Sequence, residues 1–271
     1  MRKVLNKVLP AMTALATVGM ATSAHAALVN TWSFEVTSVF SNSVFENNDG
    51  TPVITDERLE WGPVNGVKSA IGVTDTPTSG SLETNGLWSL ADQYYHENNI
   101  LPGGTNSLLS TDLAITISLT PADPAGATLD PAFERTFNIS FIETPNKLPG
   151  QTCDAGGTHG DGINVNGCAD IFVFAFDSGQ FDFNYDGANY SLFLFEDPAA
   201  MPSTLGFLSD EACEVANVAP GCFGFMTAEN ATTFAQFVLQ IEGVEVPEPA
   251  VLGLFGLGLV GLGFARRRKA A

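Results

Sequence analysis

Histidine is the side chain that most often acts as an acid, a base or a metal ligand near neutral pH. Beyond residue 26 the chain has only two, His96 and His159. Serine hydrolysis needs a nucleophilic serine beside such a base, and no Gly-x-Ser-x-Gly sequence accompanies either histidine. His159 and Asp161 together would offer a pair of metal ligands, but a solvent-exposed loop histidine is the more common case. The histidines therefore predict no catalytic site.

Carboxylates are the other groups that could do chemistry, because paired Asp or Glu residues hydrolyse glycosidic bonds and carboxylate oxygens bind calcium. The chain has 30 acidic residues, and spacing sets no pair apart from the rest. The candidate calcium ligands are Asp154, Asp161 and Asp170, in and beside a glycine-rich segment. We expect no cofactor, with calcium as the one alternative left open.

The segment 182–187 begins like a calcium-binding loop. Oxygen-bearing side chains stand at its first, third and fifth positions, and Gly187 stands at the sixth. Such a loop needs a bidentate acid at its twelfth position, where this chain has Phe193. Alternating apolar residues flank the segment instead, so we predict a β-hairpin with its turn over residues 186–189.

Four cysteines, an even number, predict disulfides in an exported chain. They are Cys153, Cys168, Cys213 and Cys222. Pairing Cys153 with Cys168 and Cys213 with Cys222 needs the least loop closure, so it is favoured among the three possible pairings. A zinc site built from all four thiolates is the alternative, but the chain has no Cys-x-x-Cys spacing.

The elements that must position these groups are predicted by period-2 alternation of apolar and polar residues. The alternation occurs at 31–37, 112–119, 136–141, 181–185 and 237–241, with turn-forming residues between the runs. The run from 171 to 176 is apolar on both faces and predicts a central strand. We predict one all-β domain over residues 27–245, an antiparallel β-sandwich that is jelly-roll-like. Residues 144–167 are predicted to form a long loop, and no helix is predicted within the domain.

Charge is distributed very unevenly along the chain. Between Ala27 and Glu245 there are 29 acidic residues and 4 basic ones, a net charge of −25, while seven basic residues lie nearer the two ends. A body with so few cations cannot neutralise a run of phosphates, which excludes nucleic-acid binding. Docking of the body on an anionic lipid surface is equally disfavoured, so any membrane contact is expected through the terminal segments alone.

Residues 1–26 have the composition of a secretory signal peptide. Three basic residues precede the apolar stretch 8–21, and Ala24 and Ala26 supply the small side chains that signal peptidase requires. We therefore expect signal peptidase to cut before Ala27. An uncleaved N-terminal anchor is the alternative.

Residues 246–271 have three parts in a fixed order. Pro247, Glu248 and Pro249 come first, and residues 250–265 follow without a charge and predict a short transmembrane helix. The segment ends in a basic cluster, Arg266, Arg267 and Arg268 followed by Lys269. The cluster is expected to stay on the cytoplasmic side. Such a segment could be cut off after export. The alternative is an ordinary tail anchor that stays in the membrane.

This tail closely resembles the PEP-CTERM sorting signal, and Pro247, Glu248 and Pro249 match its motif without departure. The resemblance implies that an exosortase recognises the motif and removes the tail. It further implies a Gram-negative bacterium that makes exopolysaccharide. The protein would be exported, anchored transiently in the inner membrane, and then placed at the cell surface or in the extracellular matrix.

A second resemblance lies within the body. Residues 95–101, together with 31–34 and 59–62, look like the THxN family of PEP-CTERM proteins. His96, Asn98 and Asn99 match its motif, whereas Tyr95 replaces the usual threonine and Ile100 the usual proline. No activity is established for the family, so the resemblance implies relatedness and an exported location but no reaction. From the residues we expect His96 and Asn98 to cap a loop by side-chain to backbone hydrogen bonds, with a binding site as the alternative.

Taken together, these features predict an exported, acidic, disulfide-linked protein without catalytic activity. We expect a structural or exopolysaccharide-associated role at the cell surface or in the matrix, with signal peptidase and exosortase as partners during export. The alternative is a secreted hydrolase that acts on glycans through paired carboxylates. Exposed Trp61 or Trp88 could stack on sugar rings, although tryptophans in such strand-like segments more often belong to the core.

Overall fold

The computed structural model describes residues 27–46, 48–74, 76–175, 179–200 and 203–245, together with Gly258. Residues 27–245 form one compact unit. The predicted signal peptide with Ala24 and Ala26 lies outside the described residues, as do Pro247, Glu248, Pro249 and the basic cluster. The predicted helix 250–265 also lies outside them, except for Gly258. Within the described part of the chain, no helix combines the length and apolar character needed to cross a membrane.

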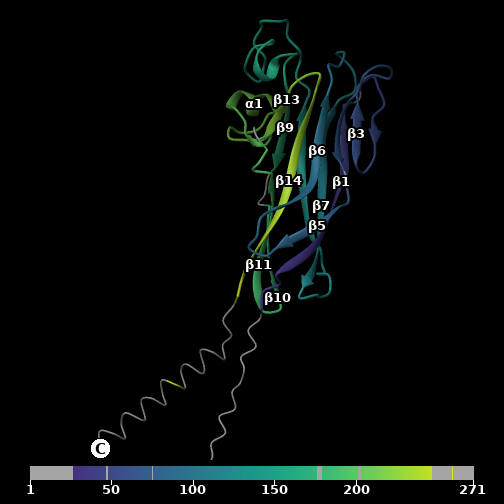
Figure 1. Cartoon of the computed structure of the whole chain (residues 1–271). Helices are drawn as coiled ribbons and strands as arrows, with labels where there is room; N and C mark the ends of the chain where they lie inside the picture. Colours follow the sequence, from purple (N-terminus) through teal and green to yellow (C-terminus); the bar gives the residue numbers. More distant parts are fainter. Residues whose placement is uncertain are drawn as a thin grey trace, which may run out of the picture. The chain divides into compact units, whose positions relative to one another are not determined.

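The all-β prediction is confirmed, because two seven-stranded antiparallel sheets make up the described body (Figure 1). The first sheet has the order β12 (Gly206–Phe207), β13 (Phe223–Thr227), β9 (Asp170–Ala175), β8 (Phe133–Ile142), β7 (Leu108–Asp123), β1 (Thr31–Phe45) and β5 (Thr78–Glu83). The second has the order β10 (Gln180–Tyr185), β11 (Ala188–Glu196), β14 (Ala231–Val244), β6 (Ser89–Asn98), β4 (Ser69–Thr74), β3 (Arg58–Trp61) and β2 (Val53–Ile54). The jelly-roll character stays a prediction.

One hydrophobic core is shared by strands of both sheets. Along β1, Trp32, Phe34 and Val36 are buried while the residues between them are not, as period-2 alternation predicts. Partners in the other sheet include Leu192 on β11 and Ile241 on β14. The strand predicted at 171–176 is confirmed as β9, which lies between β8 and β13 and is largely buried.

Alternation fails at one point in β14. Val238 and Leu239 are neighbours in sequence, yet both are fully buried. The pairing of β14 with β6 shifts register between Gln236 and Val238, which is the signature of a β-bulge. A bulge inserts one extra residue into a strand, so the alternation of core-facing and solvent-facing side chains shifts by one position there.

The hairpin predicted at 181–194 is confirmed as β10 and β11, which pair from Gln180 with Phe193 to Tyr185 with Ala188. Its turn is tighter than the predicted 186–189, because only Asp186 and Gly187 lie between the paired residues. Both have positive φ angles, +47° and +80°, as two-residue turns with a right-handed strand twist require.

Two short helical segments, neither of which shows a helical stripe in the sequence, lie within the all-β body. The 3₁₀ turn η1 spans Gly162–Asn164, and α1 spans Asp210–Val215. The Ser209 hydroxyl caps α1 by accepting a hydrogen bond from the Ala212 N–H at 3.2 Å. A six-residue helix is too short to show a periodic apolar stripe, so only its cap marks it in the sequence.

Both predicted disulfides are present in the structure. Cys153 is joined to Cys168 with 5.5 Å between their Cα atoms, and Cys213 to Cys222 with 5.8 Å. The first bond closes much of the glycine-rich loop between β8 and β9, and the second joins Cys213 in α1 to Cys222 in the segment after it. All four cysteines are therefore used, and the zinc alternative is excluded.

Candidate functional site

The motif residues His96 and Asn98 lie on β6 with their side chains fully inside the body. The His96 Nδ1 and the Thr227 hydroxyl are 2.9 Å apart, and the Asn98 Nδ2 donates to the Thr227 carbonyl at 3.1 Å. Thr227 ends β13 in the other sheet, so the two side chains connect the sheets. The prediction of side-chain to backbone bonding holds for Asn98, but the bond joins two strands and does not cap a loop.

Asn99 has a separate, local role at the end of β6. Its Nδ2 donates to the Lys68 carbonyl at 2.9 Å, and its backbone N–H donates to the Ser69 hydroxyl at 3.1 Å. The three motif residues therefore stabilise the framework through different partners.

Aromatic rings surround the His96 imidazole. It stacks on Trp61 at a centroid distance of 5.6 Å and meets Phe172 edge-on at 4.7 Å. Burial lowers the pKa of His96 to about 3, because a charged imidazolium would lose its hydration there. The ring is therefore neutral at physiological pH, and its Nε2 atom finds no hydrogen-bond partner among the residues that the structure describes.

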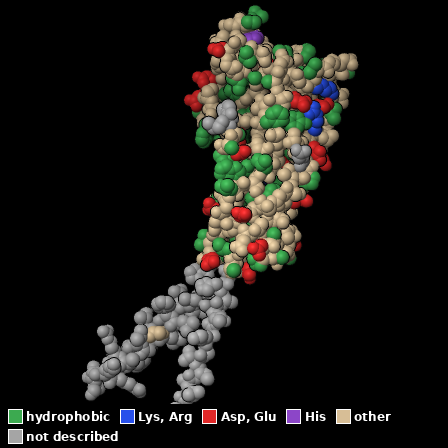
Figure 2. Space-filling model, in the orientation of Figure 1, with side chains coloured by type: hydrophobic (Ala, Val, Ile, Leu, Met, Phe, Trp, Pro, Cys, Tyr) green, Lys and Arg blue, Asp and Glu red, His purple; other side chains and the backbone are tan. Residues whose placement is uncertain are grey.

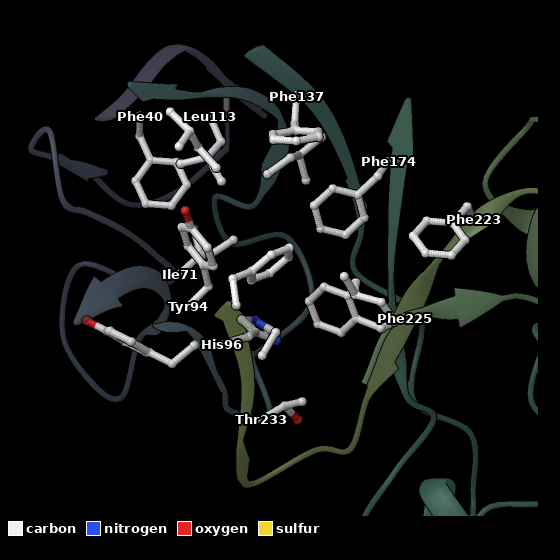
Figure 3. A pocket seen from close by; sticks show the side chains of 16 residues that line it. Phe40, Ile71, Tyr94, His96, Leu113, Phe137, Phe174, Phe223, Phe225 and Thr233 are labelled. Atoms are coloured by element: carbon white, nitrogen blue, oxygen red, sulfur yellow. The ribbon is translucent and has the colours of Figure 1, made fainter. Parts of the chain in front are cut away.

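A small apolar cavity of about 40 Å³ adjoins His96 between the two sheets (Figure 3). Phe40, Tyr94, Phe137 and Phe225 belong to its wall. With so few polar groups facing it, the cavity offers no arrangement for acid–base chemistry.

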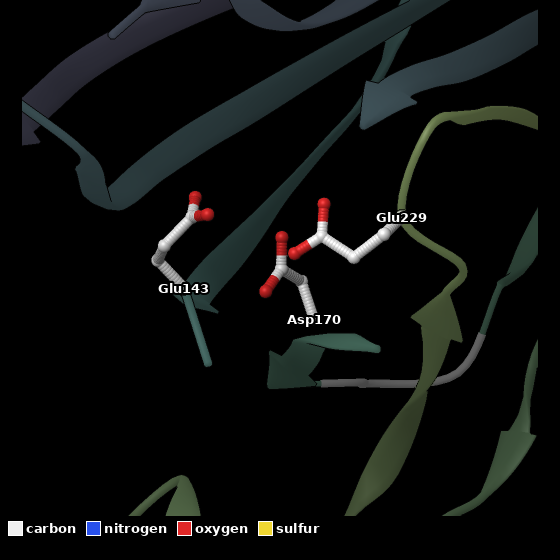
Figure 4. Close-up of side chains that lie close together, drawn as sticks. All are labelled: Glu143, Asp170 and Glu229. Carbon is white, nitrogen blue, oxygen red and sulfur yellow. The ribbon is translucent and has the colours of Figure 1, made fainter. Parts of the chain in front are cut away.

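Three carboxylates meet at a second place, near the end of β8. Glu143 follows β8, Asp170 is the first residue of β9, and Glu229 lies in the connection between β13 and β14. One oxygen from each side chain lies within 4.8 Å of the others. Asp170 and Glu229 are fully buried, and Figure 4 shows the three carboxylates directed toward one another. We refer to these three residues as the carboxylate cluster.

Local hydrogen bonds fix two members of the carboxylate cluster. The Thr144 backbone N–H donates to Asp170 Oδ1 at 2.7 Å. The Asn146 Nδ2 donates to Glu229 Oε1 at 2.6 Å. The second oxygens, Asp170 Oδ2 and Glu229 Oε2, are inaccessible to solvent and have no hydrogen-bond partner in the described part of the chain, and the same holds for Glu143 Oε2.

The segment that supplies these donors, residues 144–146, is bonded to Cys168, just before β9. The Thr144 hydroxyl donates to the Cys168 carbonyl at 2.9 Å, and the Asn146 Oδ1 accepts from the Cys168 N–H at 2.7 Å. Asn166 donates to the Glu229 carbonyl at 3.0 Å. The end of the disulfide-closed loop therefore helps to position the carboxylate cluster, through this segment and through Asn166.

Burial and mutual repulsion make ionisation of the carboxylate cluster unfavourable. Burial, followed by the charge of Glu229, raises the pKa of Glu143 to about 8. The nearby Trp61 indole opposes this rise, although its N–H does not reach hydrogen-bond geometry. Burial raises the pKa of Asp170 well above its usual range, with the Glu143 charge next in importance, and burial also raises the pKa of Glu229.

The three predicted calcium ligands do not come together. Asp154 is exposed and forms an ion pair with Lys147 at 2.9 Å, and Asp161 is exposed beside η1. Asp170 alone belongs to a group that could hold a metal. Its partners Glu143 and Glu229 were missed, because they lie far apart in the sequence and belong to no motif. The one available signal was that Glu143 and Asp170 flank the glycine-rich loop.

The remaining candidates of the sequence occupy ordinary structural positions. The His159 ring bonds the Lys147 carbonyl through Nδ1 at 2.6 Å within the loop. Trp61 is fully buried, which excludes it from sugar stacking. Trp88 is 39% exposed, between Leu87 and Leu90, which are exposed as well.

Acidic side chains are scattered over the face drawn in Figure 2, whereas basic ones occupy a small area. Arg58 on β3 donates to Glu97 at 2.8 Å and to Glu60 at 2.9 Å. Lys147 pairs with Asp154 at 2.9 Å, so neither the Arg58 nor the Lys147 ion pairs involve the carboxylate cluster.

Comparison with known proteins identifies the tail. Residues 245–269 match the PEP-CTERM protein-sorting motif. No curated protein matches the chain. The chain is thus an exported protein with a signal for sorting by exosortase, as the sequence predicts. The match does not reach the residues that resemble the THxN family, so that kinship stays a prediction.

Proposed function

We propose that the protein is a non-catalytic component of the cell surface or extracellular matrix of a Gram-negative bacterium. The sorting motif at residues 245–269 carries this proposal, because it marks the chain for export and exosortase processing. Signal peptidase would remove residues 1–26, and residues 250–265 would anchor the chain in the inner membrane until the tail is cut. The folded body, residues 27–245, is then the part that acts outside the cell.

The geometry of the carboxylates favours a non-catalytic body over a glycan hydrolase. A glycosidase needs two carboxylates that flank a sugar in an accessible cleft. The three carboxylates that come together in the described residues, the carboxylate cluster, include two fully buried members and three solvent-inaccessible oxygens. A substrate could not reach it without opening the fold.

Association with exopolysaccharide is the second part of the proposal, and Trp88 favours it. An exposed indole beside Leu87 and Leu90 offers an apolar face on which a sugar ring can stack. The body's charge of −25 would repel an acidic polysaccharide, so a neutral glycan is the expected partner.

A glycan array with the exported protein, followed by an assay for released reducing sugar, tests both parts. We expect retention on neutral glycans without sugar release, lost in W88A and kept in the matched variant F207A, which removes an aromatic ring that is 80% exposed elsewhere. Sugar release by the parent protein would contradict the non-catalytic assignment. Absence of retention would leave a structural role in the matrix and reject the glycan contact.

A further inference from the structure

Each member of the carboxylate cluster has one buried oxygen without a hydrogen-bond partner among the described residues. Asp170 Oδ2, Glu229 Oε2 and Glu143 Oε2 are all inaccessible to solvent, and none accepts a hydrogen bond within the described residues. Buried polar atoms in native proteins are nearly always satisfied, so a group of three such oxygens needs an explanation.

The hydrogen bonds around the cluster leave its inner side free. For Asp170 and Glu229, one oxygen accepts an N–H from residues 144–146, and both carboxyl groups point into the cluster (Figure 4). In known metal sites, residues around the ligands orient them through hydrogen bonds of this kind. Because the donors belong to Thr144 and Asn146, the inward orientation is set by the fold.

Electrostatics shows what kind of group would complete the cluster. Carboxylates taken out of water need a compensating charge, and the lysine and arginine ion pairs described above lie elsewhere. Glu46 adds a further negative charge near Glu143. The cluster therefore combines unsatisfied oxygen acceptors with an excess of negative charge.

We propose that Glu143, Asp170 and Glu229 bind one divalent cation, and that this cation is calcium. Oxygen ligands lie about 2.3–2.6 Å from Ca²⁺, so two ligands on opposite sides are about 4.6–5.2 Å apart. One oxygen from each side chain lies within 4.8 Å of the others, so three oxygens can contact one such ion. Magnesium usually retains several waters, for which a site with two fully buried ligands leaves little room.

Calcium titration of the exported protein, produced from the full chain and treated with EDTA, tests this inference. We expect calorimetry with CaCl₂ to give one ion per chain. We also expect a rise in melting temperature of about 3–5 °C at a calcium concentration tenfold above the dissociation constant. D170N and E229Q should each weaken binding at least about tenfold. D154N, which alters an exposed aspartate of the adjacent loop, should bind like the parent protein.

Melting temperatures measured without calcium show whether a variant binds weakly because it lacks a ligand or because it is misfolded. D170N keeps the shape of the side chain and removes one ionisable group from the crowded cluster, so calcium-free D170N should melt no lower than the calcium-free parent. E229Q gives the same comparison if D170N fails to fold.

Terbium, which takes the place of calcium and emits when a nearby indole is excited, locates the ion. Trp61 lies beside Glu143, so W61F should lose most of the sensitised emission while W88F keeps it. No calcium binding by the parent protein would overturn the inference. Undiminished binding by both D170N and E229Q would also overturn it, because the ion would then lie elsewhere.

Discussion

Asn146 connects the Cys153–Cys168 disulfide loop to Glu229 through a single side chain. Its Oδ1 accepts the Cys168 N–H at 2.7 Å, and its Nδ2 donates to the Glu229 carboxylate at 2.6 Å. Both the oxygen and the nitrogen of the Asn146 amide are hydrogen-bonded, and they join Cys168 to Glu229, which are far apart in the sequence. The loop and the carboxylate cluster are therefore one structural unit.

The first prediction concerns this connection. N146A removes both hydrogen bonds, one of them to a carboxylate, and should lower the free energy of unfolding by about 1–3 kcal/mol. Urea unfolding monitored by tryptophan fluorescence measures the change. N184A is the matched control, because the Asn184 amide donates to Asn189 at an exposed position and its removal should cost less than about 0.5 kcal/mol. Equal losses in the two variants would show that Asn146 is an ordinary surface residue.

The second prediction separates the two disulfides. Their loops span 15 and 9 residues, so the loop-entropy model gives each bond a similar contribution of roughly 3 kcal/mol. Paired serine substitutions at 153 and 168 should lower stability and also weaken calcium binding. The same substitutions at 213 and 222 should lower stability alone. Parallel melting curves and calcium titrations test this, and equal calcium affinity in both variants would argue against positioning by the loop.

The third prediction follows from the burial of His96. Its pKa of about 3 in the folded protein lies below the ordinary value of 6.5, so between these values the unfolded chain binds more protons. The free energy of unfolding therefore falls as the pH is lowered through this window. The contribution of the neutral imidazole to that free energy is complete above about pH 6.5. Between pH 7 and pH 4.5, protonation of His96 in the unfolded chain should lower the free energy of unfolding by about 2–3 kcal/mol.

Comparison with H96Q isolates that contribution from the carboxylates, which also titrate in acid. The free energy of unfolding of the parent protein should fall more steeply from pH 7 to pH 4.5 than that of H96Q. Identical pH profiles for the two proteins would mean that the imidazole can be protonated in the folded state.

Much of the fold could be predicted because its signals are local. The alternation that buries Trp32 and Phe34 needs only neighbouring residues, and the turn at Asp186 and Gly187 is recognisable from its dipeptide. The disulfide pairing follows from short separations in the sequence. The bulge beside Val238 and the helix α1 were not predictable in this way, since the first depends on pairing with β6 and the second is too short for a period.

The carboxylate cluster could not be predicted, for a physical reason. β9 pairs with both β8 and β13, and this arrangement brings Asp170 between Glu143 and Glu229. Sequence spacing contains no information about which strands become neighbours across a sheet. Asp170 was selected for its place beside the glycine-rich loop, whereas Asp154 and Asp161 from the same segment remain on the surface.

Intact-mass spectrometry of the protein recovered from the cell surface or the culture medium tests the central claim, export with exosortase processing, most directly. The expected molecule begins at Ala27, contains two disulfides and lacks Arg266, Arg267, Arg268 and Lys269. A variant with alanine at Pro247 and Pro249 should instead accumulate with the tail attached. A mature protein that retains its basic tail in both cases, or a full-length chain found in the cytosol with reduced thiols, would contradict the account.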